Sequence, residues 1–69
     1  MGMSNKIRAL LKYKGITQAE LAHRLDTVPS NIYKKIARDN FSEKELIKIA
    51  EALDCKYEGF FFLENDGKI

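Results

Sequence analysis

The sequence predicts an all-α bundle of short helices that ends in a C-terminal β-strand or short hairpin. Two observations lead to this fold class. Before residue 55, apolar residues recur at the three- and four-residue spacing of a helix in four separate stretches, and capping residues mark their ends. After residue 55, aromatic residues follow an alternating pattern that is typical of a strand. The 69 residues, 45% of them hydrophobic, fit one small domain with a thin core.

The first two helices are predicted from their ends and their apolar stripes. The first runs from Ser4 to Lys14, and Gly15 suits the left-handed residue that ends a helix. The second begins at Thr17, where "TQAE" predicts a capping box: the Thr17 hydroxyl accepts the Glu20 N–H, and the Glu20 carboxylate reaches back. We expect their buried residues to be Ile7, Leu10 and Leu11 in the first helix, and Leu21, Ala22 and Leu25 in the second.

The next two helices have equally clear starts. The third opens at Pro29, because proline suits the first helical position, and Ile32 and Ile36 define its buried side. The fourth begins at Ser42 with a second capping box, "SEKE". Its buried stripe is expected to consist of Leu46, Ile49, Ala50 and Leu53.

The aromatic tail differs in kind from the helices. We expect a strand over residues 57–64, a turn at "NDG" and a short return piece at residues 68–69. The division is therefore a helical domain over residues 1–55 and a β tail over residues 56–69. Two arrangements of the tail stay open: it caps its own helical core, or two chains pair their strands to form a homodimer. The second arrangement assigns dimerisation to Tyr57, Phe60, Phe61, Phe62 and Leu63.

The charge is unevenly distributed along the chain. Residues 1–38 carry eight bases and two acids, a balance of +6, whereas residues 39–69 carry four bases and eight acids, a balance of −4. Such a chain is expected to turn its N-terminal half toward a polyanion.

The third helix carries the side chains best suited to that role. With Ile32 and Ile36 inward, a stripe of Ser30, Lys34 and Arg38 lies on the far side, flanked by Asn31 and Ala37, with Tyr33 at the boundary. In a major groove, asparagine can pair with adenine, and lysine can reach guanine or a phosphate. The alternative is an ordinary solvated helix face.

The combination of the second and third helices resembles a known family. "TQAELAHRL" followed by "DTVPSNIYKKIARDNFSEKELIKIAEALDC" is similar to helix-turn-helix domains of the Cro and lambda-repressor type, the XRE family, over roughly residues 4–55. The shared parts are the "TQxELA" start, Leu25, Ile32 and "IAEAL". The resemblance implies a lambda-repressor-like bundle of four to five helices, with the helix over residues 29–37 in the major groove of double-stranded DNA.

The resemblance also implies which residues contact DNA. Gln18 matches the family glutamine beside a phosphate, and the loop from Arg38 to Asn40 matches a phosphate-contacting loop. Two positions depart from the family: Asp26 replaces a glycine in the turn, and Val28 replaces a capping serine or threonine, so Thr27 is expected to cap instead, shifting the helix start by one residue. The predicted DNA-binding residues are Gln18, Thr27, Pro29, Ser30, Asn31, Tyr33, Lys34, Arg38 and Asn40.

These features predict a cytoplasmic, sequence-specific transcriptional regulator, most simply a repressor that reads a pseudo-palindrome as a homodimer. The alternative is an antitoxin or adaptor whose aromatic tail binds another protein. We expect no enzyme, metal or cofactor, because one histidine, one cysteine and four scattered glycines assemble no catalytic set. We expect a cytoplasmic location because "MGMSNKIR" has no apolar core of the kind found in signal peptides, and no stretch reaches the ~18 apolar residues of a membrane span.

Overall fold

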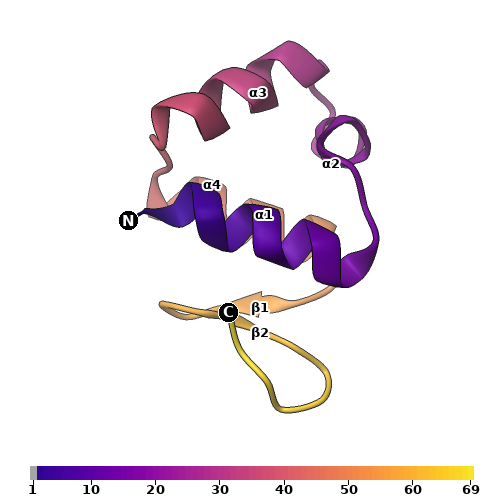
Figure 1. Cartoon of the computed structure of the whole chain (residues 1–69), viewed down its shortest axis with the longest axis vertical. Coiled ribbons are helices and arrows are strands. Elements are labelled where there is room, and N and C mark those ends of the chain that lie inside the picture. Colours follow the sequence, from indigo (N-terminus) through magenta and orange to yellow (C-terminus); the bar gives the residue numbers. More distant parts are fainter. Residues whose placement is uncertain (1) are drawn as a thin grey trace.

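The computed structural model describes residues 2–69, which form four helices and a C-terminal antiparallel hairpin. In Figure 1, α2 and α3 lie at one end of the molecule, the hairpin lies at the other, and α1 and α4 lie between them. The prediction of a mostly helical domain with a C-terminal hairpin is confirmed. The elements are α1 (Met3–Lys14), α2 (Gln18–Arg24), α3 (Pro29–Arg38), α4 (Glu43–Ala52), β1 (Lys56–Tyr57) and β2 (Phe61–Phe62).

One of the two predicted capping boxes forms completely. At the start of α4, the Ser42 N–H donates to Glu45 Oε1 at 2.8 Å, and the Glu45 N–H donates to Ser42 Oγ at 3.2 Å. At the start of α2, the Glu20 N–H donates to Thr17 Oγ1 at 3.0 Å. The Glu20 carboxylate does not reach back, because it accepts a bond from Arg24 Nε at 3.2 Å, one helical turn further on. The second half of the predicted box at Thr17 is therefore wrong.

Every helix is followed by a residue with a left-handed backbone. Gly15 ends α1 with φ 71°, as predicted. The other three positions are aspartates: Asp26 after α2 (φ 58°), Asp39 after α3 (φ 54°) and Asp54 after α4 (φ 56°). Aspartate tolerates this conformation better than most residues, because its short polar side chain can bond locally. Asp26 thus adopts, in the turn after α2, the backbone conformation that glycine adopts most readily.

A single apolar core joins all four helices to the tail. The predicted stripes of α1, α3 and α4 are buried, and so are Leu21 and Ala22 of α2, whereas Leu25 is half-buried at the helix end. The tail contributes Phe61, which is fully buried among the helical residues. No helix within residues 2–69 has the length and apolar character needed to cross a membrane.

The predicted continuous strand over residues 57–64 is wrong. The chain turns after two strand residues, at Gly59, whose φ of 79° favours glycine. Strands β1 and β2 then pair antiparallel, with Tyr57 opposite Phe61. The predicted return piece does form: Phe61 and Ile69 exchange two backbone hydrogen bonds, at 2.8 and 2.9 Å. The tail is thus a hairpin with a third short segment along β2.

The two sides of the tail face different surroundings. Tyr57, Phe61 and Leu63 pack toward the core, and the Tyr57 and Phe61 ring centroids lie 5.0 Å apart. Phe60 and Phe62 face outward and are 40% and 38% exposed. The chain therefore has the arrangement in which the tail caps its own core. Of the five residues assigned to dimerisation, Phe61 is fully buried, Tyr57 and Leu63 are half-buried, and Phe60 and Phe62 are exposed, while the assignment itself stays a prediction.

Candidate nucleic-acid interface

Two buried isoleucines fix the orientation of α3. Ile32 and Ile36 are 4% and 3% exposed, and the helix packs against α2. Because these residues lie one helical turn apart on one side, the opposite side is turned to solvent. The outward residues are those that the sequence predicted: Ser30, Asn31, Tyr33, Lys34 and Arg38, all of them exposed.

The start of α3 lacks a side-chain cap. Val28 occupies the N-cap position, makes no capping bond, and is followed by Pro29 in the first turn. The prediction that Thr27 caps the helix and shifts its start is wrong. Thr27 lies one residue too early, and its Oγ1 instead accepts a bond from Asn31 Nδ2 at 2.8 Å. This bond uses one amide hydrogen of Asn31, so the carboxamide keeps its oxygen and its other N–H for a partner.

The end of α3 is tied to the start of α1. The Ser4 N–H donates to Asp39 Oδ1 at 2.9 Å, and Ser4 Oγ donates to the Ile36 carbonyl at 2.6 Å. The backbone bond from Ser4 lowers the pKa of Asp39 below its ordinary value. These contacts span more than thirty residues of sequence, and they fix the helix end from which Arg38 and Asn40 project.

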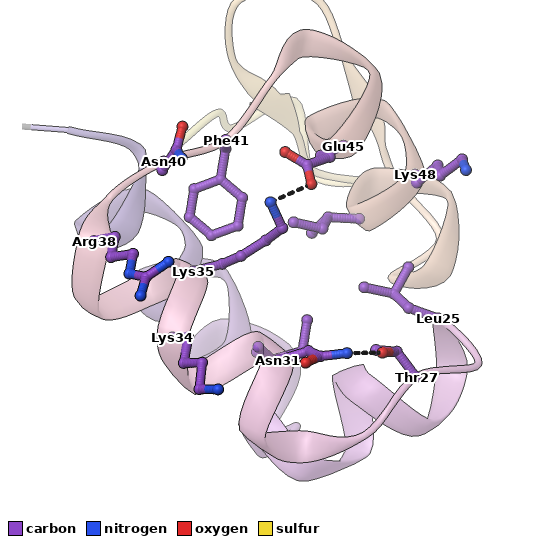
Figure 2. A pocket seen from close by; sticks show the side chains of 12 residues that line it. Leu25, Thr27, Asn31, Lys34, Lys35, Arg38, Asn40, Phe41, Glu45 and Lys48 are labelled. Atoms are coloured by element: carbon purple, nitrogen blue, oxygen red, sulfur yellow. Dashed lines mark hydrogen bonds and ion pairs between the residues drawn. The ribbon is translucent and has the colours of Figure 1, made fainter.

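A groove of about 420 Å³ lies between α3 and α4. Its lining includes four bases, Lys34, Lys35, Arg38 and Lys48, but a single acid, Glu45. Figure 2 shows Lys35 reaching across the groove from α3 to Glu45 on α4, where the two form an ion pair. This pair and the Ser42 N–H lower the pKa of Glu45.

The exposed bases of α3 are free of acidic partners. Among residues 2–69, neither Lys34 nor Arg38 has a carboxylate oxygen within 4.0 Å. The outward face of α3 and the adjoining groove therefore keep an excess of positive charge that is available to an anion.

Most of the predicted site residues come together on this side of the molecule. Five of them line the groove: Thr27, Asn31, Lys34, Arg38 and Asn40. Pro29, Ser30 and Tyr33 lie on the exposed part of α3, while Gln18 is half-buried at the start of α2 and does not line the groove.

Seven of the twelve residues that line the groove were not predicted as site residues, and Lys35, Phe41 and Lys48 are among them. Lys35 is a half-buried residue of α3 that lies outside the predicted stripe of Ser30, Lys34 and Arg38. Phe41 lies in the loop after α3, and Lys48 lies in α4. The periodicity of one helix cannot show which residues of the next helix come near it. The sequence does place Lys48 three residues after Glu45, so these two side chains were expected to lie on the same side of the fourth helix.

Comparison with known proteins identifies a family without a described function. No curated protein and no solved structure matches the chain. A family model described as a domain of unknown function, DUF6471, matches residues 2–57, which include all four helices and β1. This match covers most of the chain, and the protein therefore belongs to the DUF6471 family.

Proposed function

We propose that the protein is a sequence-specific regulator of transcription that inserts α3 into the major groove of double-stranded DNA, in the manner of a lambda-repressor-like helix-turn-helix domain. The observation that carries this proposal is the outward stripe of α3, which two buried isoleucines hold toward solvent. Within this stripe, Lys34 and Arg38 have no acidic partner among residues 2–69. A helix ~10–12 Å across fits a major groove ~12 Å wide.

The side chains divide into two roles. Asn31 and Lys34 read bases: the Asn31 carboxamide, held by Thr27, suits adenine, and Lys34 suits guanine or a phosphate. Arg38 and Asn40, at the end of α3, bind phosphates and set the position of the helix. Lys48 adds a positive charge on the α4 side of the groove, and Gln18 is the expected phosphate contact at the start of α2.

Repression by occlusion of a promoter and binding as a homodimer are further parts of this proposal. Two chains on a pseudo-palindrome would place their α3 helices about one DNA turn apart. Sedimentation of the free protein and of its DNA complex measures this stoichiometry. A complex of one chain with a single half-site would contradict the dimer and leave the role of α3 intact.

The test is selection of bound duplexes from a random library, followed by binding of the Lys34→Ala variant. If Lys34 meets a phosphate, the variant binds all duplexes more weakly, and the salt slope falls by about one. If Lys34 reads a base, the loss is ~1–3 kcal/mol and confined to the selected site. Lys44→Ala, which removes an exposed lysine of α4 outside the groove, is the control. Failure to enrich any duplex would contradict the proposal.

A further inference from the structure

The outer face of the tail carries a row of side chains that the proposed function does not use. Phe62 lies opposite Lys56 of β1 on one side and opposite Lys68 of the return piece on the other. Residues that lie directly opposite each other in a sheet share a face. Lys56, Phe62 and Lys68 therefore cross the outer face in one line, which is about 10 Å long at the usual strand spacing.

Phe60 extends this row toward α1. Its ring is 40% exposed, and the Nζ atoms of Lys6 and Lys68 each lie 4.6 Å from the ring centroid. One exposed aromatic ring thus holds two ammonium groups by cation–π contact. We call the whole set, Lys6, Lys56, Phe60, Phe62 and Lys68, the aromatic-lysine face.

The five side chains of this face carry three ammonium groups, and two of the three acids in residues 56–69 are paired, Glu58 with Lys56 and Glu64 with Lys14. Within the described part of the chain, Lys6 and Lys68 have no carboxylate oxygen within 4.0 Å, while Lys56 pairs with Glu58 at 3.2 Å. A second copy is a poor occupant, because a two-fold contact places the same patch on both sides and would bring lysines against lysines. A polyanion with flat, exposed rings complements both the charge and the aromatic groups.

We propose that the aromatic-lysine face binds single-stranded DNA. Unpaired bases stack on Phe62 and Phe60, and the ammonium groups of Lys6 and Lys68 leave the Phe60 ring to pair with phosphates. A duplex is excluded from this mode because its bases are stacked inside the helix. The five side chains contain no acceptor for a ribose 2′-hydroxyl hydrogen, and oligouridine is therefore the comparison that separates DNA from RNA binding.

This site is separate from the proposed duplex site. The tail and α3 lie at opposite ends of the molecule, with α1 and α4 between them (Figure 1). Variants of one face are therefore expected to leave binding at the other unchanged, and the two proposals can fail independently.

The experiment measures fluorescence anisotropy of a labelled fifteen-nucleotide oligothymidine with the full chain at low salt. Phe62→Leu, which keeps an apolar side chain but loses the aromatic face, is expected to weaken binding about tenfold, and Phe62→Tyr to restore it. Lys68→Ala is expected to lower the salt slope by about 0.7. Lys44→Ala, which removes an exposed lysine of α4 outside both proposed sites, is the charge-matched control and leaves oligothymidine binding unchanged.

Four results would overturn the proposal. The first is that oligothymidine does not bind, or that neither Phe62→Leu nor Lys68→Ala changes its binding although circular dichroism shows that both variants are folded. The second is at least tenfold tighter binding of the matching oligouridine, which would assign the face to RNA. The third is a concentration-dependent dimer that Phe62→Leu dissociates. The fourth is binding to phosphatidylserine vesicles that depends on Phe62 while oligothymidine does not bind.

Discussion

Helices α3 and α4 have the same length of ten residues and contribute to the same core, yet their ends are built in opposite ways. Helix α4 starts with a complete capping box, has two acids in its first turn and has no base in its last turn. Helix α3 starts at Val28 without a capping bond, has no acid in its first turn and ends with Lys35 and Arg38. The Ser42 side chain satisfies the Glu45 N–H at the start of α4. At the start of α3, by contrast, Pro29 has no N–H, and the Asn31 N–H donates to the Val28 carbonyl at 3.0 Å.

The difference shows where each helix obtains its stability. Acids near a helix N-terminus and a side-chain cap stabilise a helix locally, and α4 has both. Helix α3 lacks these features and depends on packing through Ile32 and Ile36 and on the link from Asp39 to Ser4. Because α3 has no acid in its first turn, the positive end of its dipole is left unneutralised.

The largest expected effect tests whether both helices are anchored equally. Ile36→Ala in α3 and Ile49→Ala in α4 should each lower the free energy of unfolding by ~2–5 kcal/mol, because both side chains are buried. Urea denaturation measures both, with exposed Lys34→Ala as a control expected to change stability by less than about 0.5 kcal/mol. If Ile49→Ala lowers the free energy of unfolding and Ile36→Ala leaves it almost unchanged, Ile36 does not anchor α3 in the core.

The second prediction concerns the outward face of α3. Asn31→Ala should weaken binding to the selected duplex by ~1–3 kcal/mol, because the carboxamide is the side chain best placed to read adenine. Thr27→Val, which removes only the acceptor that orients Asn31, should produce a smaller loss. Equal binding of Asn31→Ala and wild type in a gel-shift titration would remove Asn31 from the site.

The third prediction compares the two helix starts. Ser42→Ala should lower the free energy of unfolding by ~1 kcal/mol, because it removes the α4 cap. Val28→Ser should raise it by a similar amount, because Val28 already has the extended backbone of a capping residue and lacks only the acceptor. Thermal melting measures both variants. No gain from Val28→Ser would show that the bond from the Asn31 N–H to the Val28 carbonyl already satisfies the start of α3.

The smallest expected effect is the acid response of Asp39 and Glu45. The folded state lowers the pKa of both groups, from ordinary values of 3.8 and 4.5. Their stabilising contribution is therefore present above the ordinary values and is lost as the pH falls through the folded-state values. The melting temperature should fall on acidification below about pH 4.5. Asp39→Asn and Glu45→Gln should each flatten this curve, and an unchanged curve for both would contradict the assigned contacts.

Much of the helical fold could be predicted because its signals are local. Gly15, Pro29 and Ser42 mark helix ends through their own backbone or side-chain chemistry, and each does so in the structure. The paired isoleucines of α3 gave the buried side and hence the exposed one.

The remaining features depend on residues far apart in the sequence. The bond from Ser4 to Asp39 joins the first helix to the third, and the Lys35–Glu45 pair joins the third to the fourth, so no periodicity within one helix reveals them. The strand error had a local cause, because Gly59 was available as a turn signal inside the aromatic run.

The most direct test of the account is an NMR titration of the isotopically labelled chain with its selected duplex at low salt. We predict that amide shift changes concentrate on residues 27–40, with further changes at Gln18 and Lys48, while the outer side of α4 and the tail remain unchanged. Shift changes concentrated on other elements, with α3 unaffected, would contradict the assignment of α3 as the DNA-reading helix.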